Sequence, residues 1–155
     1  MTAMEVTSSE VTGVIAGRGV VAWSEADASG RFHFTAPLRW VENAEHAAYR
    51  AAVPGIDIGR FPRRAVTADY EQPLAAGDDY TVELAVERLG NSSISYRWRV
   101  IGPAGVCVTG SHTVIHVDGT GTPAAVPAPI RAALASAAGP ATRPGTGEAI
   151  VNPGS

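Results

Sequence analysis

The sequence of 155 residues holds a single cysteine, Cys107, so no disulfide bond can form within the chain. It has no apolar run approaching the ~18–20 residues that span a bilayer. The first ten residues lack the basic segment and apolar run of a secretory signal. With 12 basic and 15 acidic side chains the net charge is −3, so no basic excess favours nucleic acid or an anionic membrane as a partner. These absences predict a soluble cytoplasmic protein.

The composition is that of one globular domain. Hydrophobic residues make up 45% of the chain and charged residues 17%, and the length suits a single core. Residues 1–10 are polar and are predicted to be a flexible N-terminus, with the domain over residues 11–138. Residues 139–155 are rich in Gly, Pro, Thr and Ala, and this composition predicts a disordered C-terminal tail.

One long helix is predicted over Thr35–Ala52. Thr35 can cap the first turn, and Pro37 is tolerated there because its missing N–H would be unpaired anyway. Val53-Pro54-Gly55 ends the helix. One face carries mostly small apolar residues, which predicts very close packing; its members are Pro37, Val41, Ala44, Ala48 and Ala51. A more polar stripe is formed by Glu42, Glu45, His46 and Tyr49.

The sequence predicts five strands, one before this helix and four after it. One, Gly19–Trp23, precedes it; four follow, over Arg64–Tyr70, Asp79–Leu89, Ser93–Ile101 and Val106–Val117. Gly110 suggests a bulge in the last strand, and a short helix is predicted over Pro129–Ala138. Hairpin connections require a mainly antiparallel sheet, and only the long helix can cover one of its faces. The prediction is an α+β fold with a five-stranded antiparallel sheet wrapped around one central helix.

Four segments in this order carry a resemblance to a known family: Trp23–Gly30, Leu38–Glu45, Val66–Leu74 followed by Gly77-Asp78, and Arg88–Ser93. Over roughly residues 19–134 the chain resembles the hotdog-fold acyl-CoA thioesterases of the 4-hydroxybenzoyl-CoA thioesterase and YbgC type. The resemblance implies a hotdog fold. The chain departs from the family pattern at Glu25, at Arg31 and at Phe34-Thr35-Ala36-Pro37. The identity of the substrate is therefore not carried over.

Asp27 is the principal catalytic candidate, because the resemblance places the family's catalytic carboxylate there. Asp27 also precedes the helix, whose positive end favours an ionised carboxylate. Such a group can attack a thioester or activate a water, and the sequence leaves both open. The alternative is an ordinary turn aspartate in Asp27-Ala28-Ser29-Gly30. The resemblance also implies an oxyanion hole at the helix start, formed by the amide of Phe34 with that of His33 nearby.

Several other residues are secondary candidates. Glu42 and Glu45 are alternative carboxylates, or else solvated helix charges, and His33 either polarises the thioester or packs between aromatic rings. Arg39 is expected to form a structural ion pair. Substrate contacts are predicted for Arg31, Thr35 and Tyr70, and phosphate contacts for Arg60, Arg63, Arg64, Arg88 and Arg97. His112 and His116 lack a third zinc ligand, so no metal or cofactor is expected. Cys107 is expected in the core, and no serine-hydrolase G-x-S-x-G motif is present.

The resulting hypothesis is hydrolysis of an acyl-CoA or acyl-carrier-protein thioester by a homodimer or homotetramer. The composition favours polyketide or aromatic-acid metabolism. Two alternatives stay open: a non-hydrolytic acyl-binding or chain-release partner in a biosynthetic assembly, and a hotdog dehydratase or hydratase. The second would need a His–Asp motif that the sequence lacks.

Overall fold

The computed structural model describes residues 5–8 and 14–138. The elements follow in the order β1 (Glu5–Ser8), β2 (Ile15–Val20), η1 (Trp23–Glu25, a 3-10 helix), α1 (Ala36–Ala52), η2 (Ile58–Arg60, a 3-10 helix), β3 (Arg63–Tyr70), β4 (Asp79–Leu89), β5 (Ser93–Gly102), β6 (Gly105–Ile115) and α2 (Ala128–Ala138). The predicted C-terminal tail, residues 139–155, lies outside the described residues.

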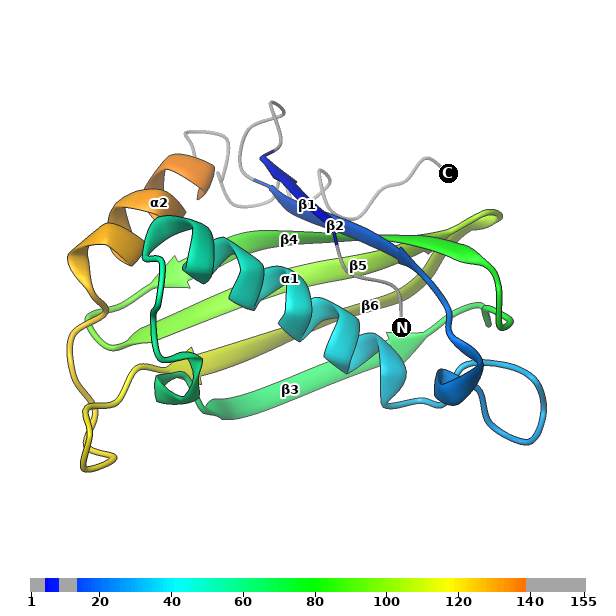
Figure 1. Cartoon of the computed structure of the whole chain (residues 1–155), viewed down its shortest axis with the longest axis horizontal. Coiled ribbons are helices and arrows are strands. Elements are labelled where there is room, and N and C mark those ends of the chain that lie inside the picture. Colours follow the sequence, from blue (N-terminus) through cyan, green and yellow to red (C-terminus); the bar gives the residue numbers. More distant parts are fainter. Residues whose placement is uncertain (1–4, 9–13, 139–155) are drawn as a thin grey trace.

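The strands form one antiparallel sheet in the order β1-β2-β4-β5-β6-β3. Helix α1 lies across one face of this sheet, and α2 packs at one end of it (Figure 1). The predicted sheet wrapped on a long helix is confirmed. Strand β1 adds a sixth strand at the edge beside β2, within the segment that we predicted to be flexible.

The buried face of α1 is broader than its alanine stripe. Pro37, Val41 and Ala44 are buried as predicted, but Ala51 is exposed. Glu45 and Tyr49, assigned to the polar stripe, are fully buried, so the expectation of a solvated Glu45 is wrong. Trp40, also buried, completes this face by stacking on Tyr80 of β4, with ring centroids 4.0 Å apart. Large aromatic side chains therefore fill the space between helix and sheet.

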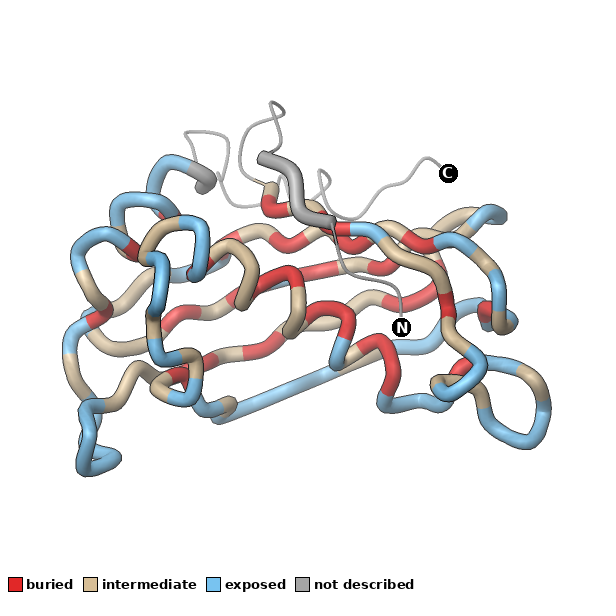
Figure 2. The backbone as a smooth tube through the Cα atoms, in the orientation of Figure 1, coloured by how far each residue is buried: buried red, intermediate tan, exposed pale blue. Residues whose placement is uncertain are grey.

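The central strands alternate as predicted. Tyr80, Val82, Leu84 and Val86 of β4 and Ile94, Tyr96, Trp98 and Val100 of β5 point into the core. By contrast, β3 lies at the sheet edge and is exposed along most of its length (Figure 2).

Two predictions about strands are corrected. The strand before α1 is Ile15–Val20, because the chain turns into η1 at Trp23, where the prediction had continued the strand. Gly110 is no bulge: it pairs in register with both Trp98 and Ala68. A Cβ at this position would collide with the Trp98 indole and the carbonyl oxygen of Thr67. The glycine is thus required by close packing.

Candidate active site

An open cleft of about 660 Å³ lies beside the first turns of α1, between that helix, the preceding loop and β3. Its lining combines charged and apolar side chains: Ser24, Glu25, His33, Thr35, Ala36, Leu38, Arg39, Glu42, Arg63 and Val66. Three predicted site residues, His33, Thr35 and Glu42, and the predicted phosphate ligand Arg63 are thereby brought together.

The start of α1 leaves one backbone donor free. The N–H of Ala36 donates to the carbonyl of His33, and residue 37 is proline and has none. The N–H of His33 donates to the carbonyl of Glu25 over 2.7 Å, so its predicted role as an oxyanion donor is wrong. Within the described residues, the N–H of Phe34 has no acceptor. It is the amide left at the helix start that can meet an oxyanion.

The side chain of His33 is oriented by its neighbours. Its Nδ1 lies 2.7 Å from the hydroxyl oxygen of Thr35 and accepts the Thr35 backbone N–H over 3.2 Å. In the neutral ring the proton is therefore on Nε2. The ring also packs on Phe34, with centroids 4.6 Å apart. Both roles considered for His33, packing and polarisation, are compatible with this geometry.

Asp27 lies at the tip of a small hairpin ahead of α1, closed by the bridge between Ala26 and Phe32. Its Oδ1 accepts the backbone N–H of Ser29 over 2.8 Å and the Ser29 hydroxyl over 2.5 Å. These two hydrogen bonds lower the pKa of Asp27 below its ordinary value. The carboxylate is ionised and solvent-exposed, but it does not line the cleft of its own chain.

Glu25, the other acid of the motif, holds the loop to the helix. Its Oε1 accepts the backbone N–H of Ala22 over 2.8 Å, and its Oε2 accepts the indole N–H of Trp40 over 2.9 Å. Nothing in the sequence pattern predicted this role for Glu25. The hydrogen bond from a buried tryptophan fixes the loop that carries Asp27 against the first turns of α1.

A family model for the thioesterase superfamily matches residues 30–109, just over half of the chain. The chain belongs to the thioesterase superfamily. This confirms the family resemblance seen in the sequence and its class of activity, thioester hydrolysis. A search of curated proteins finds no match.

Solved structures share the fold of this thioesterase-superfamily chain. A predicted thioesterase from Bacillus stearothermophilus is 23% identical with a TM-score of 0.73, covering 91% of this chain and 99% of its own. A Thermus thermophilus thioesterase complexed with coenzyme A and Zn is 24% identical with a TM-score of 0.74, covering 84% and 98%. A 1,4-dihydroxy-2-naphthoyl-CoA thioesterase from Synechocystis is 17% identical with a TM-score of 0.70, covering 79% and 96%.

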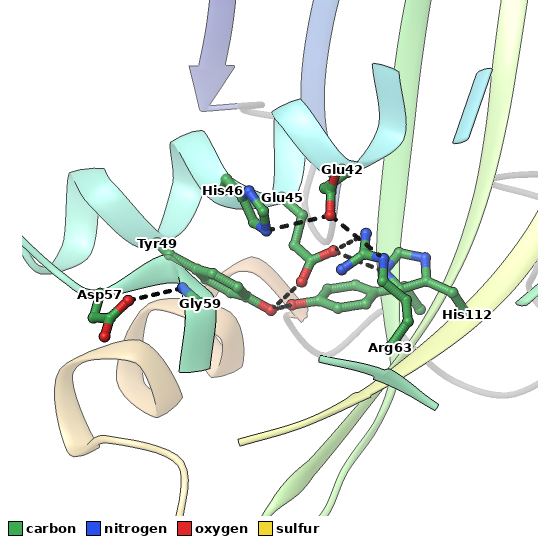
Figure 3. Close-up of polar contacts among 9 residues, drawn as sticks. Glu42, Glu45, His46, Tyr49, Asp57, Gly59, Arg63 and His112 are labelled. Carbon is green, nitrogen blue, oxygen red and sulfur yellow. Dashed lines mark hydrogen bonds and ion pairs between the residues drawn. The ribbon is translucent and has the colours of Figure 1, made fainter. Parts of the chain in front are cut away.

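In this thioesterase-superfamily chain, Glu42 and Arg63 face the cleft from α1 and β3. The Glu42 carboxylate lies 3.9 Å from the Arg63 Nε and 3.9 Å from the His46 Nε2 (Figure 3). Burial lowers the pKa of His46. Arg39 also lines the cleft, but no ion pair forms with it among the described residues, so its predicted structural pairing is wrong.

Beneath the cleft lies a buried polar cluster centred on Glu45, which is 0% exposed. Its Oε1 accepts from Arg63 Nη2 over 2.7 Å and lies 2.8 Å from His112 Nε2 (Figure 3). Its Oε2 accepts the Tyr49 hydroxyl over 2.7 Å. Burial acts to raise the pKa of Glu45, but the hydrogen bond from His112 and the charges of His112 and Arg63 outweigh it, and the pKa is lowered. The cluster therefore holds an ionised carboxylate.

A second hydroxyl extends this cluster. Tyr49 and Tyr96 have their hydroxyl oxygens 2.6 Å apart. Because the Tyr49 proton points at Glu45, the Tyr96 hydroxyl must donate to Tyr49. Burial raises the pKa of both phenols well above the ordinary value. The periodicity of the sequence predicted the helix that carries Tyr49 and the strand that carries Tyr96. It could not predict that the two hydroxyl groups form a hydrogen bond across the core.

The remaining predicted site residues are scattered. Tyr70 on β3 donates its hydroxyl to the carbonyl of Phe34, beside the candidate oxyanion donor. Arg31, Arg64 and Arg88 are exposed and line neither described pocket. Arg60 pairs with Asp57 at 3.2 Å and Arg97 with Glu87 at 3.5 Å.

The other two residues weighed in the sequence have structural partners. Cys107 is buried as predicted, and burial raises the pKa of its thiol. His116 packs against the Phe61 ring, and its Nδ1 lies 3.2 Å from the carbonyl oxygen of Ala124.

Among residues 5–8 and 14–138, no group of three or more His, Cys, Asp or Glu side chains is placed to hold a metal ion. No helix in the same ranges is long and apolar enough to cross a membrane.

Proposed function

We propose that this protein hydrolyses an acyl-CoA thioester, with the reacting carbonyl held at the start of α1. The observation that carries the proposal is the Phe34 N–H, which has no acceptor among the described residues and lies between two residues that line the cleft, His33 and Thr35. A donor of this kind stabilises the charge that develops on a thioester oxygen during attack. Family membership supports the same chemistry.

Asp27 is our proposed nucleophile or general base. Its hydrogen bonds from Ser29 keep it ionised, as either role requires. Glu42 is the competing candidate, because it lines the cleft directly whereas Asp27 does not. Arg31, Thr35 and Tyr70 would contact the acyl thioester. Arg64 and Arg88 would contact the phosphates of the carrier, whereas Arg63 is held by the buried Glu45 carboxylate and faces the acyl part of the cleft.

The test is free-thiol release from a panel of aromatic, short and long acyl-CoAs by wild type, Asp27→Asn and Glu42→Gln. We expect Asp27→Asn to lower kcat/KM by about 100-fold or more, the range for a group acting in the transition state. Glu42→Gln is expected to cost less than about tenfold, the smaller effect of a peripheral contact. A large loss in Glu42→Gln with activity retained in Asp27→Asn would transfer the role to Glu42.

We propose that the active unit is a homodimer or homotetramer. Strand β3 is an edge strand that leaves Val66 and Tyr70 exposed, and such an edge favours pairing with another chain. In a dimer of this kind, Asp27 of one subunit would act at the cleft of its partner. Light scattering tests the assembly, and a monomer over the whole concentration range used for activity would contradict it. Mixing Asp27→Asn with a cleft variant and recovering activity would support a shared site.

An acyl-carrier-protein thioester in polyketide or aromatic-acid metabolism is the second substrate class that we propose, for a cytoplasmic enzyme. The exposure of Asp27 outside its own cleft also favours a competing function, non-hydrolytic acyl binding or chain release. Co-purification with acyl-loaded carrier protein and no thiol release would favour that function. Release of thiol from either carrier would exclude it.

A further inference from the structure

Two buried nitrogen atoms carry protons that have no acceptor in the part of the chain that the structure describes. The indole Nε1 of Trp98 and the Nη1 of Arg63 are both inaccessible and both lack a hydrogen-bond partner within the described residues. Trp98 as a whole is only 1% exposed. Buried polar groups nearly always have a partner, so two such donors together need an explanation.

Both residues line one small cavity. It measures about 20 Å³, and its other walls are Leu38 and Val41 of α1, Val66 of β3 and His112 of β6. Leu38, Val41 and Val66 have aliphatic side chains, and no described wall atom, on His112 or elsewhere, lies within hydrogen-bond reach of either donor. Any acceptor for the two donors must therefore enter the cavity itself.

The cavity adjoins the candidate active-site cleft. Leu38, Arg63 and Val66 line both, so an acyl group in the cleft has the cavity next to it. Along α1 the cleft runs from Ala36 to Glu42, about 9 Å at the helical rise per residue. The cavity therefore lies where the far part of an acyl chain would reach when its thioester carbonyl is at the Phe34 amide.

The size and charge of the cavity select its occupant. A volume of this order holds about one water-sized group. An indole N–H and a guanidinium are donors only, so the occupant must be an acceptor. The positive charge of Arg63 is already matched by the Glu45 carboxylate 2.7 Å away, so the cavity does not call for an anion. A single neutral oxygen meets all three conditions.

We propose that this enzyme selects acyl groups that carry a keto or hydroxyl oxygen away from the thioester, and that Trp98 Nε1 and Arg63 Nη1 bind this oxygen. The inference rests on the proposed function and names the substrate class of that same cleft. Trp98 and Arg63 are specificity-determining residues here; neither touches the reacting carbon. An unsubstituted acyl chain would leave both donors without an acceptor, which disfavours it.

The first experiment compares kcat/KM for straight-chain acyl-CoAs and their terminal-hydroxy analogues, matched in length, in wild type and Trp98→Phe. We expect wild type to favour the hydroxy member by about tenfold or more at the best length, as for a site that donates to a substrate oxygen. Trp98→Phe should lose most of that preference, so that the kcat/KM values of the two members become similar. Trp23→Phe, the same change at an exposed position, should behave as wild type.

The second experiment needs no turnover. The indole N–H resonance of Trp98, assigned by its disappearance in Trp98→Phe, is followed while free hydroxy acid or unsubstituted acid is added. If the indole resonance shifts with the hydroxy acid but not with the unsubstituted acid, the inference is supported even when no thioester is cleaved. The oxygen site can therefore be confirmed while the proposed hydrolysis fails. Equal kcat/KM for the two members together with an unmoved indole signal would overturn it, leaving the cavity to a buried water.

Discussion

The carboxylate of Glu45 and the imidazole of His112 lie 2.8 Å apart in the core, although 67 positions separate them in the sequence. One comes from the central helix and the other from β6, and Arg63 of β3 joins them on the same carboxylate oxygen. This buried cluster ties three elements together directly below the cleft. The same hydrogen bonds that stabilise the core therefore also hold the Arg63 side chain at the cleft.

Glu45→Gln should destabilise the protein strongly. The change keeps the shape of the side chain but leaves the Arg63 charge without its buried counterion, which costs about 3 kcal/mol, the low end for a broken buried pair. Glu87→Gln is the matched control, because the Glu87–Arg97 pair is about half exposed on both sides and is worth under about 1 kcal/mol. Chemical denaturation measures both. Equal effects of the two substitutions would contradict a stabilising role for the cluster.

Acid should weaken the wild type partly through Glu45. Its pKa is lowered in the folded state, so the stabilisation is present above the ordinary value of 4.5 and is lost as the pH falls through the lower folded value. Melting temperatures of wild type and Glu45→Gln from about pH 6 to about pH 3 should therefore converge. Parallel curves would show that Glu45 is not the group responsible.

Ser29→Ala should move the acid limb of the pH–rate profile upward. The two hydrogen bonds from Ser29 hold the pKa of Asp27 down, and the substitution removes the stronger of them, the one from the hydroxyl. Activity at neutral pH should be nearly unchanged, because Asp27 stays ionised there. The measurement is kcat/KM against pH.

Thr120→Ala provides the control for that profile. It removes the equivalent hydroxyl bond to Asp118, in a turn at the opposite end of the molecule (Figure 1). The control profile should match wild type. If Ser29→Ala leaves the acid limb in place, Asp27 is not the group that must be ionised.

Gly110→Ala should be destabilising despite the small size of the added methyl group. The new Cβ would collide with the Trp98 indole and the Thr67 carbonyl, and such overpacking costs about 1–3 kcal/mol. Gly119→Ala meets nothing closer than 3.6 Å, at the flexible end of Arg60, and should be near neutral. Thermal unfolding compares the two. A near-neutral Gly110→Ala would mean that the indole shifts freely, which the packed core does not suggest.

Local signals in the sequence were sufficient for most of the fold. The alternation in β4 and β5, the breaker after Ala52 and the hairpin turn at residues 90–92 are properties of short stretches, and they predicted those elements to within a residue. The strand before α1 was predicted too close to the helix, because the apolar residues 20–23 are typical of a strand. In the structure the backbone turns there instead, and this turn brings Glu25 to the indole N–H of Trp40. That pairing depends on a contact across 15 positions.

Short motifs and periodicity are local, and they were enough to predict the family, the long helix with the four strands that follow it, and a turn at Asp27. The folded structure was needed to show that the His33 amide is already bonded and that Glu45 is buried among Arg63, His112 and Tyr49. It was also needed to show that the Trp98 indole N–H, near the cleft, has no acceptor among the described residues. The physical reason is that hydrogen-bond partnership and burial depend on residues distant in sequence. A one-dimensional pattern cannot assign them.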